Sequence, residues 1–278
     1  MSTLLTESDV WNELECGQLS LPYVTVFGGS SPGAKAASER LRRVEGIESG
    51  GFADGRLLRQ EFDAGATLKL SRIDHWHQPV RQVLEEISEV CGAGVVAHAF
   101  MSPPGDEHVI TAHLDGVHVF ILQCSGTKDW VAGYVDPDSP SGAVFCDHAA
   151  IVEGRHLRTR LNAGDVLYLP HGSPHYALAR SEVSLHIAIE VQDPTPLEFL
   201  QAYCALVEAS TWSHTAVAGT GDDAEGFRQA FSAGITRIPL DEVGQVAAAL
   251  ARGRATYPTH LVDASGVAAS VRSEGLQP

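Results

Sequence analysis

The sequence is poor in cysteine, and its cysteines form no paired motif. There are five, an odd number, and no two have the CxxC spacing of redox or zinc sites. This pattern is typical of a reduced cytoplasmic protein, so we expect a cytoplasmic location and no disulfide framework. The cysteines are Cys16, Cys91, Cys124, Cys146 and Cys204.

Basic residues are also scarce. The chain has 19 lysines and arginines against 35 aspartates and glutamates, which gives a formal net charge of −16. Proteins bind a phosphate backbone by neutralising it with lysine and arginine, so this balance argues against nucleic acid as a direct partner. A strongly acidic chain favours solubility or a basic substrate.

Two further absences narrow the class of protein. No run approaches the roughly 20 apolar residues that a membrane-spanning helix needs, and the N-terminus lacks a basic segment followed by an apolar core. We therefore expect no membrane partner. The glycines of residues 28–33 are not followed by a P-loop Lys-Ser/Thr or by dinucleotide spacing, which favours a connecting loop over a phosphate cradle.

A His-x-Asp triplet and a later histidine could together hold one metal ion. On an extended strand, residues two apart point to the same face, so His113 and Asp115 can present a nitrogen and an oxygen to a shared ion. His175 follows the proline-rich turn 170–174 and begins a predicted strand, a well-fixed place for a third ligand. Such a set leaves coordination positions open, as in non-haem Fe(II) oxygenases and unlike closed structural zinc sites.

Other histidines compete for this role, because the chain has 13 and a His-x-Asp triplet alone is weak evidence. His171 lies on the turn itself and is interpreted as an exposed polar residue. His186 alternates with apolar neighbours in a predicted strand, which favours a packed histidine. His75 and His77 have His-x-His spacing, but the surrounding His-Trp-His-Gln-Pro sequence is typical of a loop that enters a helix.

Strand-forming residues surround the triplet. β-Branched and aromatic side chains at 109–111 and 119–122 predict buried strands. Residues 125–127 break the second run and 128–131 begin another, so the segment is predicted to form a hairpin. Lys128 lies in an otherwise apolar setting, where a lone ammonium is costly without an anionic partner. A carboxylate co-substrate would supply that partner; the alternative is a solvated lysine on the turn.

The chain is long enough for one large core and a smaller accessory region. A capping pattern predicts a helix start at residues 6–9. Further strands are predicted over 21–27 and 166–169. Apolar periodicity predicts helices over 78–91, 197–208 and 240–252.

Several of these motifs occur in the order found in a known family. Over roughly residues 55–195, the chain resembles the JmjC-type ribosomal oxygenases. That resemblance implies a mainly β fold, a cupin-like double-stranded β-helix with flanking helices, and hydroxylation that depends on Fe(II) and 2-oxoglutarate. The motifs are His113-x-Asp115, the run 119–123, Gly126-x-Lys128-x-Trp130, the run 164–170, His175, and Ser184-x-His186.

The resemblance also assigns roles to residues. It implies that His113, Asp115 and His175 are the catalytic iron ligands. It further implies that Lys128 pairs with the distal carboxylate of 2-oxoglutarate and that Ser184 lies near this co-substrate.

Two positions depart from the family pattern. His98 stands where an asparagine near the co-substrate is expected, so it either replaces that hydrogen bond or belongs to a changed pocket. His118 stands where an acidic residue is expected, which changes the charge predicted around the substrate entrance. The identity of the substrate is therefore not carried over from the family.

The motifs divide the chain into three parts. These are an N-terminal helix and strand segment (1–54), the double-stranded β-helix (55–195) and a C-terminal helical region (196–278). In the family that the chain resembles, a helical region mediates pairing, so a homodimer is a further hypothesis.

The sequence thus predicts an Fe(II)/2-oxoglutarate-dependent dioxygenase. It would hydroxylate an amino-acid side chain in a protein, peptide or peptide-derived metabolite and release succinate and CO2. Because Asp115 is present, no ligand position is vacated for chloride, so hydroxylation rather than halogenation is expected. Two alternatives stay open: a non-catalytic cupin-like protein that binds metal and a carboxylate, and a 2-oxoglutarate-independent cupin dioxygenase, which would not need Lys128.

Overall fold

The computed structural model divides the chain into two compact units. The barrel unit comprises Met1–Glu85 and Val96–Glu190, and the helical unit comprises Glu86–Val95 and Val191–Pro278. Cys146, Leu21, Val109 and residues 29–33 of the predicted loop lie outside the described residues. Those described are residues 4–20, 22–28, 40–44, 46–105, 110–134, 144–145, 148–210, 229, 232 and 236–256.

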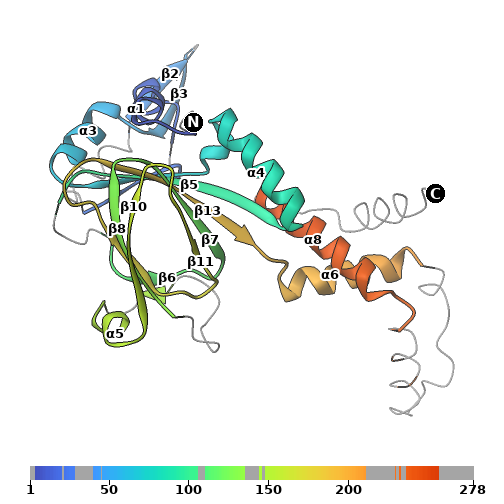
Figure 1. Cartoon of the computed structure of the whole chain (residues 1–278). Coiled ribbons are helices and arrows are strands. Elements are labelled where there is room, and N and C mark those ends of the chain that lie inside the picture. The colour runs from blue at the N-terminus through green and yellow to red at the C-terminus, as the bar shows by residue number, and fades with distance from the viewer. Residues whose placement is uncertain are drawn as a thin grey trace. The chain divides into compact units, whose positions relative to one another are not determined.

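Antiparallel strands build most of the barrel unit (Figure 1). In chain order the strands are β1 (Val24–Phe27), β2 (Arg40–Val44), β3 (Ile47–Phe52), β4 (Thr67–Ser71), β5 (Gly94–Ser102), β6 (His113–Leu114), β7 (His118–Ser125), β8 (Thr127–Gly133), β9 (Val144–Phe145), β10 (His156–Asn162), β11 (Val166–Leu169), β12 (His175–Leu178) and β13 (Ser184–Gln192). They form a six-stranded sheet in the order β1-β4-β5-β13-β7-β11, a five-stranded sheet in the order β10-β8-β12-β6-β9, and the pair β2-β3.

Alternate residues of the two large sheets share one interior. Val119 and Ile121 of β7 pack in a buried cluster with Trp130 and Ala132 of β8 and with Ala188 of β13, because successive side chains of a strand point to opposite faces. β7 and β13 belong to the six-stranded sheet and β8 to the five-stranded one, so this core lies between the sheets. The predicted fold class, a mainly β double-stranded β-helix, is confirmed.

The hairpin predicted around residues 125–127 is wrong. β7 pairs with β11, whereas β8 pairs with β10 and β12, so these consecutive strands belong to different sheets. Gly126 makes the change of sheet with a φ of 60°, in the left-handed region that glycine adopts readily. A Cβ atom here would lie 2.0 Å from the carbonyl oxygen of Val183. The local signals marked a turn correctly but carried no information about which sheet the next strand joins.

Helices α1 (Glu7–Cys16) and α3 (Gly55–Asp63) pack against each other in the barrel unit. α1 begins where the sequence predicts. The Thr6 hydroxyl accepts a bond from the Asp9 backbone N–H at 3.1 Å, and the Asp9 carboxylate accepts one from the Thr6 N–H at 2.9 Å, a reciprocal capping box. Trp11 meets Phe62 edge-on with ring centroids 5.4 Å apart. The unit also contains η1 (Ile73–His75) and α5 (His148–Glu153).

His75 and His77 lie at the entry to helix α4 (Gln78–Cys91), whose bounds match the predicted helix. The Nδ1 atom of His75 is 2.9 Å from the Tyr23 hydroxyl, and the Nε2 atom of His77 is 3.0 Å from the carbonyl oxygen of Leu4. Both histidines therefore tie the helix entry to the N-terminal segment. This agrees with their interpretation as part of a helix-entry loop.

Two helices form the core of the helical unit (Figure 1). α6 (Pro196–Glu208) begins one residue before the predicted start, and α8 (Leu240–Thr256) extends past the predicted end at 252. The Arg254 guanidinium lies 2.7 Å from the buried carboxylate of Glu198 and joins the two helices. The buried residues between them are Ala202, Ala205, Leu206, Ile238, Val243, Val246, Ala247 and Leu250.

Within the part of the chain that the structure describes, none of the helices combines the length and the apolar character that a membrane span requires.

Candidate metal centre and co-substrate cavity

The two predicted histidine ligands are cross-strand partners. His113 in β6 pairs directly with His175, the first residue of β12, and their ring centroids are 4.4 Å apart. Asp115 follows β6 at once, and its Oδ2 atom lies 3.7 Å from Nε2 of His175. One ligand atom from each of the three residues lies within 4.8 Å of the others. The structure therefore brings together all three residues predicted to hold the ion.

The strand that carries the first ligand is shorter than the sequence predicts. β6 contains only His113 and Leu114, and the preceding residues Ile110 and Thr111 lie outside any strand. Thr111 instead supplies a carbonyl oxygen to the site.

Hydrogen bonds hold both imidazoles in the same tautomer. Nδ1 of His113 is 2.9 Å from the carbonyl oxygen of Thr111, and Nδ1 of His175 is 2.9 Å from that of Ser173. Because a carbonyl oxygen only accepts, each Nδ1 carries the proton and each Nε2 keeps the lone pair that binds a metal. Burial, together with nearby His113, lowers the pKa of His175, which favours the neutral ring. This donor set fits a divalent ion such as Fe(II).

The proline-rich turn is fastened to the His-x-Asp triplet. The Gly172 N–H donates to the backbone carbonyl of Asp115 at 2.8 Å, and Gly172 has a φ of 75°, which favours glycine. The Ser173 hydroxyl donates to the carbonyl oxygen of Gly133 at 3.0 Å. These bonds fix where β12 begins, and hence where His175 lies relative to the other ligands.

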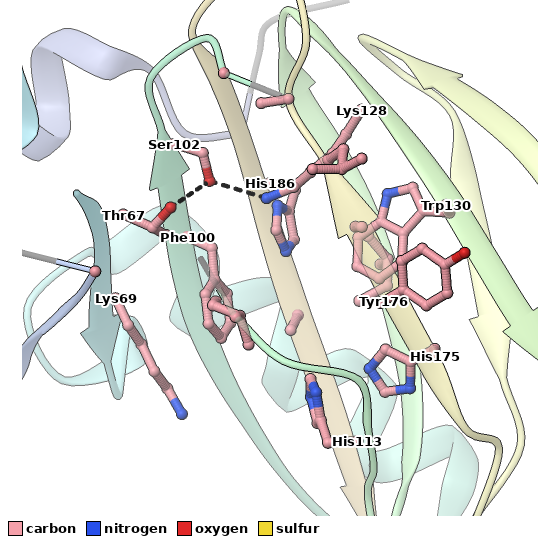
Figure 2. A pocket seen from close by; sticks show the side chains of 18 of the residues that line it. Thr67, Lys69, Phe100, Ser102, His113, Lys128, Trp130, His175, Tyr176 and His186 are labelled. Carbon is pink, nitrogen blue, oxygen red and sulfur yellow. Dashed lines mark hydrogen bonds between the residues drawn. The ribbon is translucent and has the colours of Figure 1, made fainter. Parts of the chain in front are cut away.

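A cavity of about 520 Å³ lies beside the ligands (Figure 2). Its walls come from β4, β5, β7 and β13 of one sheet and from β6, β8 and β12 of the other. Besides the three predicted ligands, its polar lining includes Thr67, Lys69, Ser102, Lys128, His186 and Glu190.

Lys128 points into this cavity. Lys128 is only 5% exposed, and its Nζ atom donates to Oγ of Ser102 at 3.0 Å. Burial lowers the pKa of Lys128 to about 7, because a poorly solvated site disfavours the charged amine. Within the described residues, no carboxylate raises the pKa of Lys128 back toward its usual value. The alternative of a solvated lysine on the turn is therefore wrong.

Aromatic rings line the cavity between Lys128 and the metal ligands (Figure 2). The His186 ring stacks on Phe100 with centroids 5.1 Å apart and meets Trp130 edge-on at 5.3 Å. Trp130 in turn lies 6.0 Å from the ring of His175. Burial lowers the pKa of His186 well below its usual value, so this ring is neutral. The prediction of a packed histidine at this position is confirmed, and His186 also forms part of the cavity wall.

Ser184 and His98, the other predicted co-substrate contacts, are not among the residues that line the cavity. Ser184 is fully buried, and its hydroxyl accepts a bond from Nε2 of Gln123 at 2.8 Å. Nε2 of His98 lies 3.3 Å from Oε1 of Glu190, which does line the cavity. Contact of Ser184 and His98 with a co-substrate stays a prediction.

His118 and His171 lie together outside the cavity lining. Nδ1 of His118 is 2.8 Å from the Tyr168 hydroxyl, and it accepts a bond from the His171 backbone N–H at 3.2 Å. His171 is half-buried, so its interpretation as an exposed residue is wrong. The contact with His118 explains the difference.

No motif in the sequence marks Thr67 or Ser102. They lie on neighbouring strands, β4 and β5, and strand alternation places them on the same faces as the cavity residues Lys69 and Phe100. Such alternation can be recognised only after the sheet is known, because a serine and a threonine on two strands have no fixed spacing in sequence.

A double-stranded β-helix that gathers two histidines, one carboxylate and a buried lysine around one cavity defines a cupin-like protein with a metal-binding site. Residues 74–199 match the JmjC domain family. Over these residues the chain is therefore similar to JmjC-domain proteins, as the sequence motifs indicated.

The curated relatives are longer proteins. The bifunctional lysine-specific demethylase and histidyl-hydroxylase NO66 of Drosophila sechellia is 28% identical over 158 residues, which cover 53% of this chain and 22% of the relative. Ribosomal oxygenase 2 of Mus musculus is 30% identical over 147 residues, which cover 49% of this chain and 30% of the relative. The chain thus matches less than a third of the length of either relative.

Solved structures share the fold. YcfD, a ribosomal oxygenase from Escherichia coli, has a TM-score of 0.51 at 16% identity, covering 91% of this chain and 65% of that chain. The structure of YcfD in complex with cobalt and 2-oxoglutarate gives a TM-score of 0.52 at 15% identity over the same shares.

Proposed function

We propose that the protein is an Fe(II)/2-oxoglutarate-dependent hydroxylase. The proposal rests on one observation: the same cavity contains the three-ligand cluster and the buried amine of Lys128, whose pKa no described carboxylate raises. An open metal site next to one cation suits a keto acid that carries a second carboxylate. Support also comes from relatives named as hydroxylases and oxygenases, and from the YcfD complex with cobalt and 2-oxoglutarate.

Four residues of the cavity have a defined task in this proposal. His113 and His175 hold the ion through their Nε2 atoms, and Asp115 contributes negative charge to the site. Lys128 binds the distal carboxylate and so orients the keto acid toward the ligands. Bound Fe(II) supplies the redox chemistry in which 2-oxoglutarate and O2 become succinate and CO2 while a substrate carbon is hydroxylated.

The substrate in this proposal is an amino-acid side chain in a protein, peptide or peptide-derived metabolite. The names of the relatives, a histidyl-hydroxylase and a ribosomal oxygenase, support a protein or peptide target. We also propose a cytoplasmic location, because the cysteines are odd in number and include no CxxC spacing, as in a reduced cytoplasmic protein.

The test is anaerobic titration of the protein with Fe(II) and 2-oxoglutarate, followed by exposure to O2 and measurement of succinate. The wild-type protein should form succinate, even without its substrate, through uncoupled turnover. His113→Ala and Asp115→Ala should lose nearly all of this activity, because each removes a ligand. His171→Ala is the matched control, since this histidine lies outside the cavity lining, and should retain activity.

Two outcomes would contradict the proposal in different ways. Binding of Fe(II) and 2-oxoglutarate without succinate formation would indicate a non-catalytic metal- and carboxylate-binding protein. O2 consumption that needs Fe(II) but neither 2-oxoglutarate nor Lys128, as judged with Lys128→Ala, would indicate a 2-oxoglutarate-independent dioxygenase.

A further inference from the structure

A groove of about 500 Å³ lies on the outer face of the five-stranded sheet. Successive side chains of a strand point to opposite faces. Lys128 and Trp130 of β8 line the cavity with the metal ligands, so Asp129 between them points outward into the groove. On the neighbouring strand β10, Arg160 lies directly opposite Asp129. The groove is therefore separate from the cavity and opens on the other side of the same sheet.

Positive charge dominates this groove. Within the part of the chain that the structure describes, its charged lining residues are Arg158, Arg160, Arg180 and Asp129. We call it the arginine groove. Three guanidinium groups against one carboxylate leave an excess of positive charge, on a chain whose formal net charge is −16. Composition alone predicts no such site, because β10 and the residues after β12 contribute arginines that are distant in sequence.

Asp129 holds two of the guanidinium groups in place. Nε of Arg160 donates to its Oδ1 atom at 2.6 Å, and Nε of Arg180 donates to its Oδ2 atom at 2.9 Å. The Arg160 side chain is nevertheless 58% exposed and that of Arg180 50%. The two guanidinium groups are therefore ordered in advance and still open to a ligand from solvent.

Arg158 has only a neutral partner among the described residues. Its Nε atom donates to Nε2 of His156 at 3.0 Å. Nδ1 of His156 lies 2.9 Å from the carbonyl oxygen of Gly154, so Nδ1 carries the proton and Nε2 accepts. The charge of Arg158 is thus balanced by no carboxylate of the groove that the structure describes.

The arginine groove adjoins the cavity that contains the metal ligands. Tyr176 and Leu178 of β12, together with Trp130 of β8, line both of them. The same strand β12 begins with His175, and Tyr176 lies beside Trp130 and His175 in the cavity view (Figure 2). A chain segment bound in the groove therefore lies next to the cavity.

We propose that the arginine groove binds an aspartate- or glutamate-rich segment of the peptide substrate, while a neighbouring residue of that peptide enters the cavity. This inference rests on the proposed function and narrows its substrate to a protein or peptide with an acidic segment. The planar forks of arginine match carboxylates in geometry, and clusters of arginine recognise acidic motifs. The apolar lining of Val131, Tyr176 and Leu178 suits the methylene groups of such side chains.

The chemistry of the whole chain favours a short acidic peptide over nucleic acid. A polyanion that extends beyond the groove would meet the field of a strongly acidic protein, which repels it. An acidic segment of a few residues places its charge only where the arginines lie. The excess of acidic residues in the composition therefore does not exclude an acidic substrate at this site.

The first experiment measures binding of fluorescein-labelled hexaglutamate to the purified chain by fluorescence anisotropy, with hexaglutamine as the uncharged comparison. Hexaglutamate should bind and hexaglutamine should not. Arg158→Gln, which leaves both ion pairs of Asp129 intact, should weaken hexaglutamate binding about threefold, and Arg158→Gln with Arg160→Gln about tenfold. Salt at about 1 M should remove most of the binding, because it screens exposed charges.

Arg56→Gln is the matched control. Arg56 is an exposed arginine of α3 that lines neither the groove nor the cavity, so its loss changes the net charge by the same amount and should leave binding within twofold. Far-UV circular dichroism and thermal unfolding establish that each variant is folded. An equal loss in Arg56→Gln and Arg158→Gln would overturn the inference, and so would tighter binding of labelled oligothymidine than of hexaglutamate.

The second experiment tests the link to the substrate. Two pools of synthetic peptides share a randomised centre, which is flanked by glutamates in one pool and by glutamines in the other. With Fe(II), 2-oxoglutarate and O2, mass spectrometry should detect the gain of one oxygen atom mainly in the glutamate pool. At low peptide concentration the Arg158→Gln and Arg160→Gln double variant should reduce this product about tenfold, whereas Arg56→Gln should not.

The outcomes separate this inference from the proposed function. Succinate formation with equal hydroxylation of both pools, or with none in either, would overturn the acidic-substrate inference and leave the hydroxylase proposal standing. If the wild-type protein forms no succinate, the proposed function fails. The anisotropy measurement needs neither 2-oxoglutarate nor O2, so it still decides whether the arginine groove binds acidic peptides.

Discussion

Lys128 is the residue whose chemistry depends most on its surroundings. In water its amine would be charged at every physiological pH, but burial lowers its pKa to about 7. The groups that line the cavity near it are Ser102, which is uncharged, and His186, which is neutral because burial lowers its pKa too. The charge of Lys128 therefore depends on whether an anion occupies the cavity.

This dependence predicts the effect of pH on co-substrate binding. Below pH 7 the amine is already protonated, so affinity for 2-oxoglutarate should be constant. Above pH 7 binding must take up a proton, because the bound carboxylate raises the pKa of Lys128, and affinity should fall by up to tenfold per pH unit. Calorimetry of the Co(II)-loaded protein in buffers of different ionisation enthalpy measures both effects. Constant affinity between pH 7 and 9 would contradict the prediction.

The same lowered pKa predicts a pH effect on stability without ligand. Between about pH 7 and 10.5 the unfolded chain binds a proton on Lys128 and the folded chain does not, so stability rises with pH across this range. Lys128→Met removes this contribution. As the pH rises, the free energy of unfolding of the wild-type protein should therefore increase relative to that of Lys128→Met, by on the order of a few kcal/mol. Urea unfolding at several pH values provides the measurement, and a pH-independent difference would refute the prediction.

At the scale of single elements, the change of sheet at Gly126 places Lys128. The residue two positions later on β8 faces the interior only because the chain crosses from one sheet to the other at this glycine. Any side chain here would need the left-handed φ of 60° and would also meet the carbonyl oxygen of Val183. A side chain at position 126 would therefore destabilise the fold in two ways, through backbone strain and through a steric clash.

Gly126→Ala and Gly164→Ala should differ because only one of them meets a clash. Gly164 also has a positive φ, of 97°, but nothing lies within 4 Å of the position its Cβ would take. Gly164→Ala should thus cost about 1–2 kcal/mol through backbone strain alone. Gly126→Ala should cost a further 1–3 kcal/mol or so through overpacking. Chemical denaturation measures both, and equal losses would show that the contact with Val183 relaxes freely.

Elements with a strong local pattern could be predicted from the sequence. The periodic apolar residues of α4, the turns that bound β11, and the proline before His175 gave these elements their correct bounds. The pairing of β7 with β11, and of β8 with β10 and β12, could not be predicted, since sheet membership depends on contacts between distant residues. For the same reason Ser102 and Thr67 were not identified, whereas His113, Asp115 and His175 have a recognisable order along the chain.

At the scale of the whole molecule, the compact units do not follow the predicted parts 1–54, 55–195 and 196–278. The helical unit also includes Glu86–Val95, from the end of α4 to the start of β5. Its own core lies between α6 and α8. The predicted division describes the order of motifs along the chain, and as a description of domains it stays a prediction.

The homodimer hypothesis predicts a mass in solution of twice the 29.6 kDa of one chain. Sedimentation equilibrium over a range of protein concentrations provides the measurement. Apolar side chains exposed on α6 support the hypothesis, since Leu197 is 62% exposed and Leu200 59%. A double substitution, Leu197→Glu with Leu200→Glu, should shift the mass toward that of the single chain. A wild-type protein with the mass of one chain at every concentration would remove the hypothesis.

Under the proposed function, the direct pairing of His113 with His175 would also make the stability of the folded protein depend on iron supply. In a chain that has lost its β6–β12 register, these donors no longer meet, so an ion binds the native state alone and adds RT ln(1 + [M]/Kd) to its stability. Cells short of iron would then hold a protein that unfolds, and is degraded, more readily. Iron scarcity would then lower the abundance of the protein as well as the rate of its proposed reaction.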